Sequence, residues 1–378
     1  MHQLSTLFAD LPGGGALWSF LAFVIVVGVL VFVHELGHYL AARSVGIRVE
    51  VFSIGFGREV FGWFDRAGTR WKVCLMPLGG YVKMFAMSGE VQPKDVKKAD
   101  REHAFIMKNV WQRMWVVAAG PLANFVFAIV VVSGVFMFVG EARQLAVIGG
   151  IQEDMPAKAA GFELADKIVA VDGKALSYWT DFANTIRASK GKALAMTVER
   201  NGAPLTLTVT PKVGEVTDIL GKKHEYFMVG LSPKEDAIVF EKHGLLQALW
   251  GGVDYTYDKA STILIAIWRM ATGQMPPDLG GPFTIAKVAG DFASAGGLQL
   301  LMFMVFISIN LGLVNLFPVP VLDGGHLLYF AIEAVKGSPV SERGQEWANR
   351  AGLGIIFLLM AFVLYKDVRN VILPYFIG

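Results

Sequence analysis

The sequence has little charge and a single cysteine, and each shortage excludes a class of protein. Charged residues make up 17% of the 378 positions, whereas a soluble domain usually carries about 25%. Since 54% of the residues are hydrophobic, the chain is predicted to be an integral membrane protein. Cys74 is the only cysteine, so an internal disulfide and a cysteine-based metal site are both excluded.

The low net charge and the lack of Lys and Arg near the N-terminus exclude two further kinds of protein. The formal net charge is only +2, and this balance does not support nucleic-acid binding, which needs a basic patch. No lysine or arginine precedes the first apolar run, and that run is too long for the apolar core of a signal peptide. We therefore expect the first segment to be a retained membrane helix.

Long apolar runs predict about four transmembrane helices. A span needs about 20 residues. The fourth run is somewhat short, but residues 371–377 could extend it. The expected spans are 16–42, 114–140, 298–322 and 351–365.

The distribution of basic residues predicts the orientation in the membrane. Segment 43–110 holds twelve Lys and Arg against seven Asp and Glu, and the N-terminal tail has no Lys or Arg. Because basic loops stay in the cytoplasm, segment 43–110 is expected inside and the N-terminus outside. Four spans then place residues 141–290 outside.

The regions between the spans differ in pattern. Glycine-punctuated runs in 43–110 predict short β-hairpins at the membrane surface, and alternating strands with Asp-Gly and Asn-Gly turns in 141–232 predict a β-rich domain. Residues 241–275 look amphipathic and are expected along the outer interface. The predicted domains are an N-terminal membrane domain, the β-rich domain, an interfacial linker and a C-terminal membrane domain, at 1–140, 141–232, 233–297 and 298–378.

His34, Glu35 and His38 come directly after the uncharged part of the first span, residues 16–33. On a helix the two histidines lie one turn apart on the same face, so both imidazoles can reach one ion. Zinc accepts imidazole nitrogens, and Glu35 would stay close enough to act as a general base. A carboxylate at membrane depth costs about 2.5–3.5 kcal/mol, which makes a chance match improbable.

Asp323 is the best candidate for a third, oxygen ligand. The first and third spans run in the same direction, so their C-terminal ends should reach the same depth. Pro318 and Pro320 break the third helix there, and Asp323 follows. Without the histidine motif, this aspartate would be better explained as a helix cap or a turn residue.

Four motifs stand out in the sequence: His34-Glu35-x-x-His38, Gly120-Pro121-x-x-Asn124, Gly281-Pro282 and Asn315-x-x-Pro318-x-Pro320-x-Leu322-Asp323-Gly324. Together these motifs resemble the site-2 protease family, most closely its bacterial RseP-type branch. Residues 149–173 resemble part of a PDZ domain. The resemblance implies an α-helical polytopic membrane protein with a cytoplasmic membrane-associated β-hairpin region and an inserted β-rich, PDZ-like periplasmic domain.

The resemblance also implies residue roles. His34, His38 and Asp323 would bind Zn²⁺, and Glu35 would activate water. Asn315 and Asn124 would hold the substrate strand or polarise its carbonyl, although intramembrane amides also hydrogen-bond neighbouring helices.

The resemblance finally implies substrates and a location. The family cleaves single-pass membrane proteins within or near their spanning helix, and RseP-like members trim anti-sigma factors and remnant signal peptides. The location would be the bacterial inner membrane, with the N-terminus and the PDZ-like domain in the periplasm. That domain could bind a peptide or act as a spacer, and only one such domain fits in 141–232.

Two alternatives remain from other functional classes. One is a non-catalytic membrane scaffold whose PDZ-like domain captures partners, but such a protein would be expected to lack the base or a ligand. The other is a metal transporter that uses the same ligands, but the sequence shows no inverted repeat.

Overall fold

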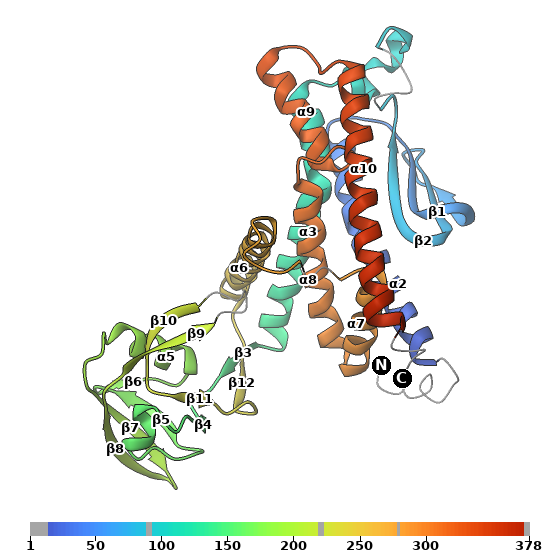
Figure 1. Ribbon diagram of the computed structural model, residues 1–378. Coiled ribbons are helices and arrows are strands. Elements are labelled where there is room, and N and C mark those ends of the chain that lie inside the picture. Colours follow the sequence, from blue (N-terminus) through green and yellow to red (C-terminus); the bar gives the residue numbers. More distant parts are fainter. Residues whose placement is uncertain (1–13, 88–92, 218–222, 278–279, 374–378) are drawn as a thin grey trace. The chain divides into compact units, whose positions relative to one another are not determined.

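The computed structural model describes residues 14–87, 93–217, 223–277 and 280–373 (Figure 1). Its described residues form two compact units. The membrane unit comprises residues 14–132, 252–265 and 277–373 apart from the gaps, and the β-rich unit comprises residues 133–251 and 266–276.

The described residues contain four helices long and apolar enough to cross a membrane, as the sequence predicted. In Figure 1 they run side by side. The third ends at Leu316 rather than at residue 322, because the prolines that follow cannot continue a helix. The fourth begins before residue 351 and continues into a π-helical turn, Val368–Ile372. The helices are α2 (Gly14–Ser44), α3 (Val110–Phe138), α8 (Gly297–Leu316) and α10 (Glu342–Asp367).

Three further helices complete the C-terminal half. Helix α6 (Leu245–Ala271) falls within the predicted amphipathic segment, whereas α7 (Pro282–Ala295) and α9 (Asp323–Lys336) were not predicted. Helix α7 packs along α2 and against α8.

Asp367, at the end of α10, caps the N-terminus of α7. Its carboxylate is 1% exposed. It accepts hydrogen bonds from the backbone amides of Gly281, Phe283 and Thr284 and from the Thr284 hydroxyl, at 2.6–3.3 Å. A helix N-terminus leaves such amides without partners of its own, so the last span is fixed to α7 through one side chain.

Segment 43–110 forms one long hairpin that folds back on itself, and not several short ones as expected. Strands β1 (Val49–Phe64) and β2 (Arg70–Met84) are followed by the 3₁₀ turns Pro93–Asp95, Lys98–His103 and Phe105–Met107. Residues 51–54 pair with 80–83 on one side and with 70–73 on the other, and 70–73 also pair with 61–64. The hairpin therefore makes a curled sheet in which 80–83 lies next to 51–54.

Aromatic and polar contacts hold this hairpin against α2. Phe52 is fully buried and stacks on Trp71 with ring centroids 4.1 Å apart. The Tyr39 hydroxyl of α2 donates to Asp65 at 2.7 Å, and the Trp71 ring nitrogen donates to the same carboxylate at 2.9 Å. Burial alone would raise the pKa of Asp65, but these bonds outweigh it and hold that pKa at about 2.

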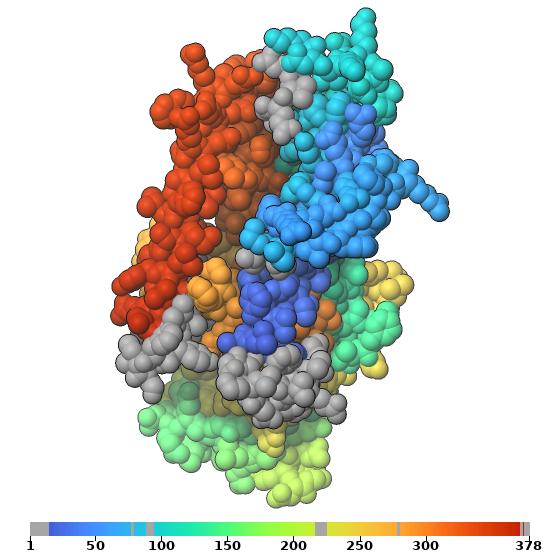
Figure 2. All heavy atoms as spheres, turned by 90° about the vertical axis from the view of Figure 1, so that its right-hand side faces the viewer, coloured from blue at the N-terminus to red at the C-terminus, as the bar shows by residue number. Residues whose placement is uncertain are grey.

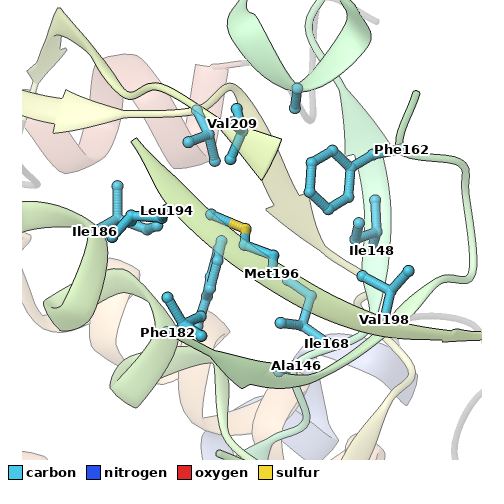
Figure 3. Packing of buried hydrophobic residues seen from close by; sticks show 13 residues of the cluster. Ala146, Ile148, Phe162, Ile168, Phe182, Ile186, Leu194, Met196, Val198 and Val209 are labelled. Carbon is cyan, nitrogen blue, oxygen red and sulfur yellow. The ribbon is translucent and has the colours of Figure 1, made fainter. Parts of the chain in front are cut away.

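The β-rich unit is organised around a four-stranded sheet of order β6-β5-β7-β8. Burial alternates along β7, as the sequence pattern predicted. The buried side chains of its core come from the sheet, α5 and the flanking strands (Figure 3). The elements are β3 (Glu141–Gln144), β4 (Ile148–Ile151), α4 (Pro156–Ala159), β5 (Lys167–Val171), β6 (Lys174–Ala175), α5 (Trp179–Ala188), β7 (Leu194–Arg200), β8 (Ala203–Val209), β9 (Lys212–Thr217), β10 (Lys223–Met228), β11 (Leu231–Pro233) and β12 (Ile238–Glu241).

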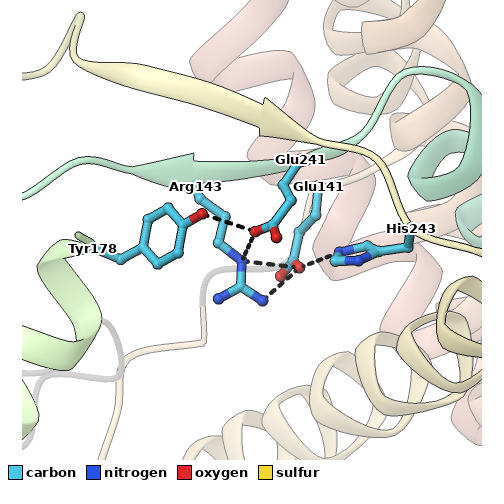
Figure 4. Close-up of polar contacts among 5 residues, drawn as sticks. All are labelled: Glu141, Arg143, Tyr178, Glu241 and His243. Carbon is cyan, nitrogen blue, oxygen red and sulfur yellow. Dashed lines mark hydrogen bonds and ion pairs between the residues drawn. The ribbon is translucent and has the colours of Figure 1, made fainter. Parts of the chain in front are cut away.

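The two ends of this domain meet in the β3–β12 ribbon, so pairing continues beyond residue 232. Figure 4 shows the polar cluster on the ribbon, in which Glu141 accepts from His243 and Arg143, each at 2.9 Å, and Tyr178 donates to Glu241 at 2.9 Å. Burial would raise the pKa of Glu141, but its two donors outweigh it and keep that pKa below the usual value.

Candidate metal centre

Three potential ligand atoms from α2 and α9 converge in the membrane unit. His34 Nε2 lies 3.1 Å from Asp323 Oδ2, and His38 Nε2 lies 3.5 Å from the same oxygen. The two Nε2 atoms are 3.2 Å apart. Both histidines are buried. The sequence prediction that distant parts of the chain would meet here is confirmed.

The spacing of these atoms fits a single zinc ion. Two donors bound to one tetrahedral zinc at about 2.0–2.1 Å lie about 3.3 Å apart, and the three observed separations bracket that value. Two imidazoles and one carboxylate also form a donor set that catalytic zinc uses, with the fourth position left for water. The residues present therefore fit the metal.

The orientation of His38 is set by a backbone carbonyl of α3. Its Nδ1 lies 2.9 Å from the Val116 oxygen. A carbonyl oxygen can only accept, so Nδ1 carries the proton and Nε2 keeps its lone pair for the centre.

Glycines allow α3 to approach α2 closely at this level. A Cβ built on Gly120 would overlap the His38 imidazole, and one built on Gly37 would overlap the backbone of Ala119. These two positions explain why glycine stands within the His-Glu-x-x-His and Gly-Pro motifs. The glycine of the Gly-Pro motif, Gly120, thus leaves space for the imidazole of His38, one of the three candidate metal ligands.

Asp323 begins α9, directly after the proline-containing turn. A carboxylate in the first turn of a helix is stabilised by the helix dipole. Val321, two residues earlier, has a φ of 87°, a conformation that costs a β-branched residue energy and recurs at functional sites. The turn that delivers Asp323 is therefore strained.

Glu35 lies between the two histidines in sequence and faces the hairpin. Val82 of β2 lies beside its carboxylate, and a Cβ on Gly80 would come within 3.3 Å of its Cγ. Strand β2 therefore runs directly beside the candidate base.

The two predicted asparagines lie at different places. Asn124 is fully buried on α3, with its amide 3.1 Å from His34 Nδ1. Asn315 lies half-buried in the last turn of α8. The contribution of Val116, Gly120 and Val82 was missed by sequence reasoning. Gly120 and Asn124 repeat the four-residue spacing of the two histidines, and this shared spacing is the signal that could have revealed the role of Gly120.

The β-rich unit has a groove of its own. It lies between α5 and the segment 226–231, and its lining mixes apolar side chains with polar ones, among them Arg187 and Gln152. Apolar side chains that line it include Trp179, Phe182, Ile186, Phe227, Val229 and Leu231.

Comparisons with known proteins assign the chain to a family. The model of "Peptidase family M50" matches residues 22–359. A protein of Rhizobium meliloti (strain 1021) named "Putative zinc metalloprotease" is 37% identical over 356 residues, which cover 92% of this chain and 95% of the relative. The regulator of sigma-E protease RseP of Salmonella typhimurium (strain 14028s) is 34% identical over 451 residues, covering 93% of this chain and 98% of the relative.

The alignment with the Salmonella protein shows a difference in length. Since 93% of this chain is about 350 residues, about 100 of the 451 aligned positions have no counterpart here. Among solved structures, the PDZ domain of an SdrC-like protein from Listeria monocytogenes matches with 18% identity and a TM-score of 0.19, over 24% of this chain and 87% of that one.

Proposed function

This chain belongs to peptidase family M50, and we propose that this membrane zinc metalloprotease cleaves single-pass membrane proteins within or near their spanning segment. The observation that carries the proposal is the triangle of His34, His38 and Asp323 donor atoms, 3.1–3.5 Å apart, enclosed by membrane helices. The complete set of ligands and base argues against a non-catalytic scaffold.

Each residue of the centre has a proposed role. His34, His38 and Asp323 hold the metal, which when bound acidifies a water and polarises the substrate carbonyl. Glu35 takes a proton from the attacking water and returns it to the leaving nitrogen. Asn315, near the end of α8, holds the substrate backbone beside the centre.

The hairpin supplies a docking edge for the unwound substrate. A peptide bond in a helix is shielded by the helix's own hydrogen bonds, so the substrate must become extended before attack. Among the described residues, no strand pairs with the outer side of 80–83, and Gly80 and Val82 lie beside Glu35. An extended substrate would add to this edge by β-pairing. Figure 2 shows a hollow between the hairpin (light blue) and α10 (red) through which it would enter.

The proposed substrates are anti-sigma-factor-like proteins and remnant signal peptides. One relative bears the name of a regulator of sigma-E protease, which supports the first class. The groove beside α5 supports a peptide ligand for the β-rich domain, since a groove with pockets for side chains can accept an added strand.

We place the protein in the bacterial inner membrane, with the N-terminus and the β-rich domain in the periplasm. The excess of basic residues in 43–110 supports this orientation. In intact cells, an impermeant thiol reagent should label Lys174→Cys and leave Lys98→Cys unlabelled until the membrane is opened. The reverse pattern would overturn the orientation.

The catalytic proposal is tested with Glu35→Gln. The purified variant, in liposomes with a single-pass substrate, should bind zinc as the wild type does but produce no cleavage product. Glu153→Gln, an exposed residue of the β-rich unit, is the matched control and should cleave normally. Cleavage by Glu35→Gln at the wild-type rate would remove the proposed mechanism.

A further inference from the structure

We infer that Asn124 is a positioning residue for His34. Its side-chain oxygen accepts the Nδ1–H of that imidazole and thereby keeps Nε2 unprotonated for the metal. The inference rests on the proposed zinc site and adds to it a residue of α3 that acts through a ligand and not on the substrate.

The surroundings of Asn124 favour this role. The residue is fully buried, and its amide lies 3.1 Å from His34 Nδ1. Within the described part of the chain, Asn124 Oδ1 is buried without a hydrogen-bond partner. A buried polar atom left in this state costs about 1–3 kcal/mol, so an amide kept here needs a use, and the imidazole is the group it faces.

The direction of the hydrogen bond follows from metal binding. An imidazole that binds a metal through Nε2 carries its proton on Nδ1 and donates it to a neighbouring acceptor. For His38 that acceptor is the Val116 carbonyl, at 2.9 Å. For His34 the group in the corresponding place is the Asn124 amide, so the metal-binding form needs its oxygen end.

The Asn124 amide can serve both forms of the ring. The oxygen and nitrogen of an amide exchange places by a half-turn of the group. With Nδ2 toward His34, the amide donates to Nδ1, and Nε2–H can donate to Asp323, 3.1 Å away. With Oδ1 toward the ring, the amide accepts and Nε2 is free. The orientation of the Asn124 amide therefore depends on whether His34 Nε2 carries a proton or binds the metal.

The helix register places Asn124 for this task. His34 faces Asn124 and His38 faces Gly120, so one four-residue step on α2 matches one on α3. The Ser308 hydroxyl of α8 donates to the backbone carbonyl of Asn124 at 2.9 Å. This bond ties α8 to the turn of α3 on which the Asn124 side chain stands, and α8 is the helix that precedes Asp323 in the chain.

A substrate-contacting role, which the sequence suggested for Asn124, leads to a different expectation. An amide that binds a substrate carbonyl would affect cleavage and leave zinc affinity unchanged. An amide that orients His34 would change zinc affinity without any substrate present. The two roles are therefore separated by measuring metal binding alone.

The experiment measures zinc affinity of the purified full-length protein in detergent by competition with a chromophoric chelator. Asn124→Leu has a similar size and no acceptor, and should bind zinc about 10–100-fold more weakly than wild type, as is typical for loss of a partner of a ligating histidine. Asn124→Asp keeps an acceptor and should stay within about threefold of wild type. Asn310→Leu, whose amide donates to the Phe306 carbonyl of its own helix, is the matched control with unchanged affinity.

The outcomes separate this inference from the proposed zinc site. Wild-type affinity in Asn124→Leu would overturn the inference, and so would equal weakening in Asn124→Leu and Asn124→Asp, which would make the amide a donor. If Asn124→Leu does not fold, the Asp variant decides alone, since a 10–100-fold loss there contradicts the inference. The zinc site itself would fail if wild type bound no zinc or if His38→Ala bound it equally well.

Discussion

The β-rich unit and the membrane unit differ in what they enclose and what they expose. The core of the β-rich unit is a cluster of apolar side chains that includes Ile168, Met196 and Val198, each fully buried. The membrane unit buries apolar clusters as well, but Phe357 and Leu358 on α10 are 73% and 75% exposed. Its buried residues include His34, His38, Asn124, Ser308 and Asp367.

The physical reason for this difference is the solvent. In water, burial of apolar surface drives folding, so the apolar side chains mark the core. In lipid there is no such drive between helices, and packing and polar contacts hold them together. In a membrane unit the buried polar side chains therefore mark where helices meet.

The largest expected effect comes from a matched pair of leucines. Leu194 of the β-rich unit is 5% exposed and Leu358 of α10 is 75% exposed. Leu194→Ala should lower the free energy of unfolding by about 2–5 kcal/mol, whereas Leu358→Ala should change it by less than about 0.5 kcal/mol. Denaturant unfolding of the two variants in the same micelles measures both. Equal losses of unfolding free energy in the two variants would contradict the proposed difference between the two units.

A buried charge in the β-rich unit sharpens the comparison. Arg200 donates to Asp166 at 2.7 and 2.8 Å. Burial raises the pKa of Asp166, but the bonds from Arg200 and from the Glu163 amide outweigh it, so that pKa lies below its usual value. The resulting stability is present above about pH 4 and is lost as the pH falls toward the lowered pKa.

Asp166→Asn should therefore destabilise the β-rich unit by about 2 kcal/mol at pH 7. Because wild-type Asp166 gains protons as the pH drops, the gap between the two proteins should narrow at pH 3. Denaturant unfolding at both pH values measures the gap, with the exposed Asp154→Asn as control. A gap that stays constant with pH would mean that the charge of Asp166 does not contribute.

The smallest expected effect concerns the cap of α7. Asp367→Asn keeps the size of the side chain but places an amide nitrogen against backbone donors, which should cost about 1 kcal/mol. Thermal unfolding and faster hydrogen exchange at the amides of Phe283 and Thr284 would report it. The exposed Asp258→Asn should leave both unchanged, and an equal response in the two variants would show that the buried cap does not hold α7.

Much of the membrane unit was predictable because its signals are local. An uncharged run of sufficient length can only be a span, and the four-residue spacing of His34 and His38 requires a shared helix face. Asp323 was predicted from the parallel direction of two spans. The end of α8 was placed too late because apolar composition continues past Leu316, while the backbone stops at the prolines.

The features that escaped prediction depend on tertiary contacts. Helix α7 is short and includes Lys287 and Asp291, so it does not stand out as apolar, and only Pro282 at its start marks it. The fold-back of the hairpin depends on which strands pair, and alternation alone does not specify register. The facing of Asn124 and His34 required knowing how α2 and α3 lie against each other.

The close fit of Gly120 against the His38 ring has a mechanical consequence. With no clearance between α2 and α3 at this level, any sliding or rotation along that seam would drive backbone into the imidazole. Helices α2 and α3 therefore have to move together at this level, as one rigid pair.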